Sequence, residues 1–258
     1  MGATHTELPD GRIVSVGGEH EDYYDPDFCI YNDVVVQGPA DQIEIYGYPT
    51  EVFPPTDFHT ATEVDGRMVI IGGLGYQQSR RPGHTPVYSL DLSNYRISEQ
   101  RTTGENPGWI FKHQADLANG MIKIWGGEVI QANGDKERYR RTLNEYTLDT
   151  MSWAWVRTTN RNWRQWSIRQ ENGSFFIQDG RPKPEALLPR NIDYERASCD
   201  AWNGARIIVE GVAVSLTVGV SFIDLIVEGD LSTETSARLA EEIRHNAEAA
   251  TGRRCIFD

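Results

Sequence analysis

Three histidines recur at a fixed spacing along the first half of the chain. His5, His59 and His113 are separated by 54 residues in both intervals. Three imidazoles that converge at equivalent positions of a repeated structure could hold a zinc ion, because histidine is one of its usual ligands. A repeat also repeats its packing residues, and a histidine at a strand start can simply hydrogen-bond a neighbouring segment. We favour this structural interpretation, and we predict neither a metal nor a cofactor.

A second group with possible chemistry is the acidic and aromatic segment 19–27. It holds five carboxylates and two tyrosines in nine residues. It lacks the glycine and the ligand spacing of a helix–loop–helix calcium site. Aromatic side chains supply contact area and carboxylates supply charge complementarity, so the segment suits a basic protein partner. The residues predicted to contact that partner are Glu19, Glu21, Asp22, Tyr23, Tyr24 and Asp25.

The equivalent segments of the next two repeats are basic. The second carries Arg80 and Arg81, which we include in the predicted partner site. The third carries Lys136, Arg138, Arg140 and Arg141. If the repeats are arranged around an axis, the basic segments could face the acidic one. A solvated or internally neutralised segment 19–27 is the alternative.

The same short elements surround each histidine. A strand leads into an Asx-Gly turn, at Asp10, Asp65 or Asn119, which favours a two-residue hairpin because both central residues need positive φ. A β-branched, apolar strand follows and ends at a pair of glycines. These pairs are Gly17–Gly18, Gly72–Gly73 and Gly126–Gly127. We expect them where a side chain would collide with a neighbouring element or where the backbone turns sharply.

A third strand follows in each repeat, and it carries Tyr88 or Tyr146. An aromatic residue comes seven positions later, Tyr95 or Trp153, and fits the start of a fourth strand. Four antiparallel strands with a double glycine and spaced aromatics resemble the kelch motif of β-propeller proteins. The resemblance covers residues 1–158, and the first copy departs from it after its glycines. It implies that each repeat is one propeller blade whose innermost strand begins at the histidine.

The remaining residues, 159–258, lose the repeat. They predict a small α+β region: a hairpin over 167–178 that turns at 171–173, a proline-punctuated extended connection over 181–189, a long hairpin that turns near residues 217–219, and one helix from Thr233 to Ala250. The predicted fold is therefore mainly β. It comprises three kelch-like blades over 1–158 and an α+β capping domain over 159–258.

Three blades alone leave the predicted ring incomplete, because closed propellers generally have at least about four. An open arc would expose apolar blade faces and strand edges. We expect the C-terminal region to cap this arc. Pairing of two chains to complete the ring is the alternative, so the choice between monomer and dimer stays open.

Charge and composition restrict the possible partners. The net charge is −13, and residues 1–158 carry −10 of it, from 23 acidic and 13 basic residues. An acidic surface repels nucleic-acid phosphates and anionic lipids and attracts basic proteins, although plain solubility also explains it. The three cysteines are scattered without metal spacing, and no apolar run approaches the ~20 residues of a membrane helix. We therefore predict a cytoplasmic protein with neither a nucleic-acid nor a membrane partner.

No catalytic motif accompanies these features. The sequence has no G-x-S-x-G, H-E-x-x-H, Walker or Rossmann pattern. The leading hypothesis is a non-catalytic protein-interaction protein. A concrete form is an acidic immunity or inhibitor protein that neutralises a basic toxin or effector domain. The alternative is a carbohydrate-active or metal-dependent propeller enzyme that uses the repeated histidines or the acidic segment.

Overall fold

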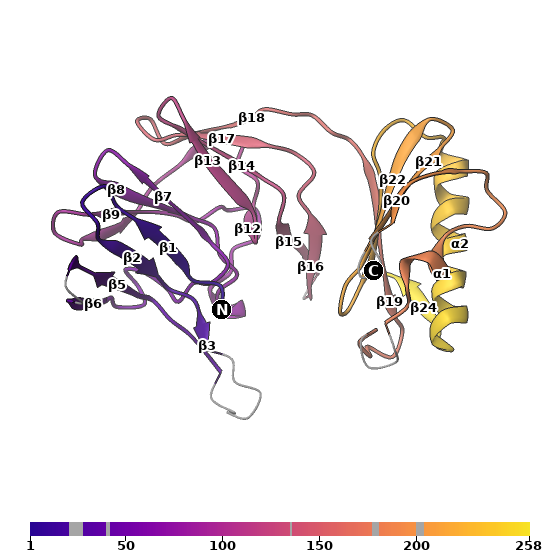
Figure 1. Cartoon of the computed structure of the whole chain (residues 1–258), viewed down its shortest axis with the longest axis horizontal. Helices are drawn as coiled ribbons and strands as arrows, with labels where there is room; N and C mark the ends of the chain where they lie inside the picture. Colours follow the sequence, from indigo (N-terminus) through magenta and orange to yellow (C-terminus); the bar gives the residue numbers. More distant parts are fainter. Residues whose placement is uncertain (21–27, 40–41, 135, 177–180, 200–203) are drawn as a thin grey trace. The chain divides into compact units, whose positions relative to one another are not determined.

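The computed structural model of the chain describes residues 1–20, 28–39, 42–134, 136–176, 181–199 and 204–258. This part of the chain is mainly β, as predicted. It divides into two compact units, Met1–Asn160 and Arg161–Asp258, which are described separately (Figure 1). No described helix is both long enough and apolar enough to cross a membrane.

Three antiparallel meanders make up most of the first unit. The first sheet has the order β1 (Thr4–Glu7), β2 (Ile13–Val16), β5 (Asp33–Gln37) and β6 (Ile43–Gly47). The second sheet consists of β7 (Thr60–Val64), β8 (Arg67–Ile71), β9 (Val87–Asp91) and β10 (Ile97–Glu99). The third sheet consists of β13 (Gln114–Ala118), β14 (Met121–Trp125), β17 (Tyr146–Asp149) and β18 (Ala154–Arg157), to which β11 (Thr103–Gly104) adds in parallel.

Two smaller sheets lie in the connections between second and third strands of a meander. In the first connection, β3 (Glu19–His20) pairs with β4 (Cys29–Ile30). In the last connection, β15 (Glu128–Asn133) and β16 (Lys136–Arg141) form a hairpin, and β12 (Trp109–Phe111) pairs with β15. The connections between the second and third strands therefore differ between repeats, because β3–β4 and β15–β16 are built differently.

The Asx-Gly turns form as predicted in the second and third sheets. Asp65 and Asn119 have φ of 50° and 53°, and each is followed by a glycine with positive φ. The first turn is longer, because Leu8 N–H donates to the Arg12 carbonyl at 2.8 Å across residues 9–11. The paired residues Glu7 and Ile13 of the first sheet are equivalent to Glu63 and Met68 of the second sheet. The segment between Glu7 and Ile13 is one residue longer than the segment between Glu63 and Met68.

Two apolar cores join the three sheets face to face. The core between the first and second sheets includes Val14, Val16, Val34, Val36, Met68, Ile70, Tyr88 and Leu90. The core between the second and third sheets includes Val69, Ile71, Val87, Ile122, Ile124, Leu148 and Trp155. Each sheet has two faces, which we name by the residue just before its glycine pair: Val16, Ile71 or Trp125. The face that carries this residue is the forward face of the sheet. The other is the rear face. In both cores a forward face packs on the rear face of the next sheet.

Each glycine pair permits close contact with the backbone of a neighbouring segment, as predicted. A Cβ atom at Gly17 would lie 2.3 Å from the Thr56 carbonyl oxygen, and one at Gly72 would lie 2.3 Å from the Ile110 carbonyl oxygen. Neither backbone oxygen can move aside easily. In the third pair the close contact is made by the second glycine: no atom lies within 4 Å of a Cβ at Gly126, but a Cβ at Gly127 would lie 2.4 Å from the Phe111 carbonyl oxygen.

The second unit is a six-stranded sheet with two described helices. Its strand order is β20 (Glu195–Cys199), β21 (Gly204–Val209), β22 (Val212–Val218), β23 (Ile223–Val227), β19 (Arg164–Gln170) and β24 (Cys255–Phe257). Helix α2 (Thr233–Thr251) is capped by Ser232, whose hydroxyl accepts from Thr235 N–H at 3.0 Å, and it ends at Gly252. Its apolar residues, including Leu239 and Ile243, lie in the core of the sheet, so the predicted helix is confirmed.

Three predictions for this unit are wrong. The predicted long hairpin is divided by a turn at Glu210–Gly211, so β21, β22 and β23 form a meander. A second helix, α1 (Pro184–Leu187), interrupts the predicted extended connection, because Pro184 at its first turn has the φ that a helix start requires. Strand β19 pairs with β23 and β24 at long range, where the sequence indicated a local hairpin.

Candidate functional site

The first strands of the three sheets form the lining of a shallow groove. Strand β1 contacts β7, and β7 contacts β13, so the three strands lie side by side (Figure 1). The groove has a volume of about 330 Å³. Its lining is mostly polar and consists of Thr4, His5, Thr6, His59, Thr60, Ala61, Thr62, His113, Gln114 and Ala115. All three predicted histidines therefore reach the same groove.

Backbone hydrogen bonds join the starts of these strands in series. Phe58 N–H donates to the Gly2 carbonyl, and Lys112 N–H donates to the Phe58 carbonyl, both at 2.8 Å. Gly2, Phe58 and Lys112 have φ of 71°, 53° and 55°, so each repeat enters its first strand through the same left-handed conformation. The three residues are thus structurally equivalent.

Strand register shows that the three histidines are not all equivalent. Thr4, Thr60 and Gln114 each pair with the residue before a glycine pair. His59 and His113 come directly before Thr60 and Gln114, whereas His5 comes directly after Thr4. The predicted triple equivalence is therefore wrong, and Ala3 occupies the histidine position of the first repeat. The longer first turn explains why a constant spacing in sequence does not give a constant place in the fold.

His59 and His113 link adjacent sheets. Nε2 of His59 lies 2.9 Å from the Thr4 hydroxyl, and Nε2 of His113 lies 2.9 Å from the Thr60 hydroxyl. Both rings are buried, at 5% and 4% exposure. His5 is exposed, and its Nδ1 lies 2.8 Å from Ser15 Oγ. Among the described residues, no three or more His, Cys, Asp and Glu side chains are placed so that they could hold a metal ion. The hydrogen bonds of His59 and His113 to threonines of neighbouring strands are of the kind that the structural interpretation expects.

Acid is expected to destabilise the first unit through these two residues. Burial lowers the pKa of His59 to about 3, with a further contribution from His113, and burial lowers the pKa of His113 to about 4. An unfolded histidine has a pKa of about 6.5. Between about pH 6.5 and 4 the unfolded chain binds protons that the folded unit does not, so stability decreases by roughly 1 kcal/mol per pH unit for each histidine.

This effect can be measured by urea unfolding at about pH 7, 6 and 5. The His113→Asn variant should show a shallower decrease in free energy of unfolding toward acid than the wild type. Thr60→Val is the control, because it removes the hydrogen-bond partner and keeps the titrating ring, so it should retain the wild-type pH dependence. Equal pH dependence in wild type and His113→Asn would contradict the prediction.

The predicted acidic partner segment lies mostly outside the described residues. Glu21, Asp22, Tyr23, Tyr24 and Asp25 fall in residues 21–27, which the structure does not describe. Glu19 is described in β3, where it pairs with Ile30. Its carbonyl also accepts from the Met1 amino group at 2.7 Å. The start of this segment is therefore held by backbone contacts to the chain's own N-terminus.

Arg80, from the predicted partner site, is held inside the first unit. Its Nη1 lies 2.6 Å from Glu137 Oε2 and donates to the Tyr139 hydroxyl at 2.9 Å. Its Nε donates to the Leu74 carbonyl at 3.0 Å, and its Nη2 to the Gly75 carbonyl at 2.9 Å. The side chains of Arg80 and Glu137 are only 10% and 15% exposed. The polar groups of Arg80 are therefore engaged by the chain itself.

Arg81, the next residue, has a different environment. Its Nη2 lies 2.7 Å from Glu99 Oε1, and both side chains are exposed, at 56% and 41%. An exposed ion pair of this kind opens at little energetic cost. Arg81 thus stays available to an external carboxylate, and Glu99 to an external cation.

Sequence reasoning missed one buried acid near this site. Asp57 is fully buried, and its Oδ1 accepts from Gly75 N–H at 2.7 Å. Burial raises the pKa of this carboxyl, and the Gly75 N–H opposes the increase. Only the three-dimensional contact identifies Asp57, because nothing in its sequence neighbourhood marks it as buried.

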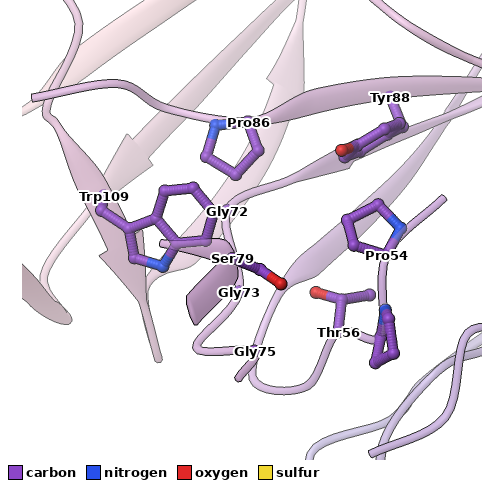
Figure 2. A pocket seen from close by; sticks show the side chains of 10 residues that line it. Pro54, Thr56, Gly72, Gly73, Gly75, Ser79, Pro86, Tyr88 and Trp109 are labelled. Atoms are coloured by element: carbon purple, nitrogen blue, oxygen red, sulfur yellow. The ribbon is translucent and has the colours of Figure 1, made fainter. Parts of the chain in front are cut away.

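An enclosed pocket near Asp57 is too small for a ligand. Figure 2 shows Pro54, Thr56, Pro86, Tyr88 and Trp109 around it. The space inside is about 10 Å³, which is near the minimum for a single water molecule. This pocket is therefore a packing defect between the second sheet and its connections, and it offers no room for a substrate.

The sequence and the fold were also compared with known proteins. No protein-family model matches the sequence. No curated protein matches it significantly. A solved structure titled "Structure of YjhT" is similar at 10% sequence identity and a TM-score of 0.47, over 100% of this chain and 80% of that chain. A likeness at this level carries no argument about fold or function.

Proposed function

We propose that the first unit is an arc of three kelch-like propeller blades that serves as a non-catalytic binding surface for a basic protein. The blade assignment is supported by three antiparallel meanders that pack forward face on rear face, with their first strands side by side. Blades arranged in this way place their connecting segments together at the ends of the sheets, where loops commonly bind partners.

The distribution of charge carries the binding proposal. Residues 1–158 contribute −10 of the net charge of −13, with 23 acidic and 13 basic residues. Exposed acids of the described part of this unit include Glu7, Glu44, Glu51, Asp65, Glu105 and Asp116. Such a field attracts a basic partner and repels nucleic acid. The partner-binding residues remain the predicted Glu19, Glu21, Asp22, Tyr23, Tyr24, Asp25 and Arg81.

The buried titratable groups of the unit support a binding role over catalysis. His59 and His113 hydrogen-bond threonines of neighbouring sheets, and Arg80 is neutralised by Glu137. The groove between the first strands is open and polar. No described geometry favours the carbohydrate or metal alternative. A concrete form of the proposal is a cytoplasmic immunity or inhibitor protein that covers a basic toxin or effector domain.

Neutralising the acidic segment should weaken partner capture. The test variant is Glu21→Gln/Asp22→Asn/Asp25→Asn, and the matched control is Asp193→Asn/Glu195→Gln/Asp230→Asn, which removes exposed acids from the second unit. Immobilised full-length protein is exposed to native-host lysate at about 50 mM and about 300 mM salt, because screening separates electrostatic capture from other capture. We expect a basic protein that the wild type and the control retain, and that the test variant retains roughly tenfold less.

Two outcomes would contradict the proposal. One is the absence of any salt-sensitive basic protein among the captured species. The other is equal loss of capture in the test and control variants, which would indicate a general effect of net charge with no localised site.

A further inference from the structure

One register position shows that the rear face of the first sheet lacks a cover. The fourth strands of the three sheets each have one residue at this position: Ile43, Ile97 and Trp155. Across the third strand these residues line up with Ile13, Met68 and Ile122 of the second strands, respectively. Ile97 and Trp155 are 8% and 2% exposed, since the preceding sheet covers them, whereas Ile43 is 63% exposed. The second strands show the same difference: Ile13 is 37% exposed, whereas Met68 and Ile122 are both 0% exposed.

The forward face of the third sheet shows the same feature at the other end of the series. Val16 and Ile71, which precede their glycine pairs, are fully buried by the next sheet. Trp125 precedes the third pair and is 37% exposed. Val156, on the same face, is 59% exposed. The series of sheets thus begins and ends on uncovered apolar faces.

We propose that two copies of the chain close into a ring of six sheets. The forward face of the third sheet in each copy packs on the rear face of the first sheet in the other copy. Both internal junctions already join these two kinds of face, so the new junction continues an established interface. A two-fold axis generates both new junctions at once, which closes the assembly.

The backbone supports the same continuation. Each left-handed residue at a strand start donates its N–H to the carbonyl of its equivalent in the preceding sheet, as Phe58 does to Gly2 and Lys112 to Phe58. Within the described residues, the Lys112 carbonyl and the Gly2 N–H have no such backbone partner. In the ring, Gly2 of the second copy donates to Lys112. The polar groove along β1, β7 and β13 becomes half of a central channel.

The forward face of the third sheet carries charges of opposite sign, because Lys123 and the exposed Asp116 are directly paired in the register. Lys123 lies where Val14 and Val69 lie in the other sheets. Its Nζ is 2.6 Å from Glu145 Oε2 and 5.8 Å from the centroid of the Trp125 ring. The lysine is therefore already neutralised by its neighbour, and the aromatic ring remains as an apolar contact.

The second unit offers poor chemistry for covering these faces. Its sheet packs one face on α2. The opposite face carries Ile208 and Ile226 but is otherwise mostly polar. There Ser167 Oγ donates to Asp224 Oδ1 at 2.6 Å, and Arg206 Nη2 lies 2.5 Å from Glu228 Oε2. A polar sheet face loses hydration without compensation when it covers isoleucine and tryptophan. A second copy instead brings an apolar face of matching register.

The test measures the mass of the full-length chain by sedimentation equilibrium at about 1–100 µM, a range typical for specific association. The wild type is expected to be a dimer. Ile43→Glu and Val156→Glu each place a charge on one face at a side chain more than half exposed, so folding of the single chain is retained, as circular dichroism will check. Each variant alters both junctions and should weaken dimerisation roughly 100-fold. Met151→Glu is the control, because Met151 is 78% exposed in a turn and should leave the dimer intact.

Mixing the two variants distinguishes this ring from other dimers. A mixed pair has one junction with both charges and one junction with none, so Ile43→Glu and Val156→Glu should associate with each other more tightly than either does alone. A wild-type monomer overturns the proposal. A dimer that Ile43→Glu or Val156→Glu leaves intact also overturns it, as does assembly beyond two copies. This inference does not depend on the proposed basic partner, whose capture assay is independent of chain mass.

Discussion

Replacing Gly72 with alanine is expected to destabilise the first unit by about 2–5 kcal/mol. The φ of 70° at this position costs an L-residue about 1–2 kcal/mol. The added Cβ would lie 2.3 Å from the Ile110 carbonyl oxygen. That oxygen accepts a hydrogen bond from Gly73 N–H at 2.9 Å, and displacing it leaves a buried group unpaired at a cost of about 1–3 kcal/mol.

Gly126→Ala is the matched control for this prediction. Gly126 occupies the equivalent position of the third sheet and has a φ of 66°, but no atom lies within 4 Å of its added Cβ. We expect a loss of only about 1–2 kcal/mol, which is the backbone strain alone. Native-state amide exchange of peptides from β8 and β14 measures both losses within the first unit. Equal losses in the two variants would refute the steric role assigned to Gly72.

Removing the Arg80 side chain is the second change with a large expected effect. Arg80→Ala leaves the Glu137 carboxylate, at 15% exposure, without its cation, and it leaves the Gly75 carbonyl without its donor. The Leu74 carbonyl keeps only the Trp109 indole N–H as a donor. Breaking a largely buried pair from one side costs about 3 kcal/mol or more, because the remaining charge stays desolvated. We expect this loss in the free energy of unfolding of the first unit, measured by urea titration.

Arg81→Ala provides a neighbouring control for this ion pair. The Arg81–Glu99 pair is exposed on both sides, so its loss should cost less than about 1 kcal/mol. The double variant Arg80→Ala/Glu137→Gln should be more stable than Arg80→Ala alone, because it removes the uncompensated charge. If Arg80→Ala costs no more than Arg81→Ala, Arg80 does not hold the β15–β16 hairpin to the second sheet.

Local chemistry in the sequence predicted the hairpin units and the capped helix correctly. Asp65 and Asn119 form the expected turns, because an Asx-Gly pair favours the positive φ that a two-residue hairpin needs, although Asp10 in the longer first turn does not adopt it. Tyr95 and Trp153 both have a φ of 56°. Tyr95 lies two residues before the fourth strand β10, and Trp153 lies one residue before the fourth strand β18, so both occupy the turn that leads into that strand. Ser232 and Gly252 delimit α2 through contacts within a few residues.

The candidate site was less predictable, because it depends on contacts between distant segments. Arg80 appeared to be a surface cation, and only its approach to β16, 57 residues away, shows that Glu137 neutralises it. His5 appeared equivalent to His59, and only the strand register places Ala3 there instead. A shift of register moves side chains to the other face of a strand, which sequence spacing alone does not reveal.

By itself, then, the sequence determined the repeated hairpins, the glycine positions and the mainly β character, because turn geometry and strand patterning act over a few residues. The tertiary structure alone decided which histidines join neighbouring sheets, which arginine is buried, and how β19 pairs with β23 and β24. It also decided which sheet faces are left uncovered, since burial is a property of what packs against a residue and cannot be read from the residue itself.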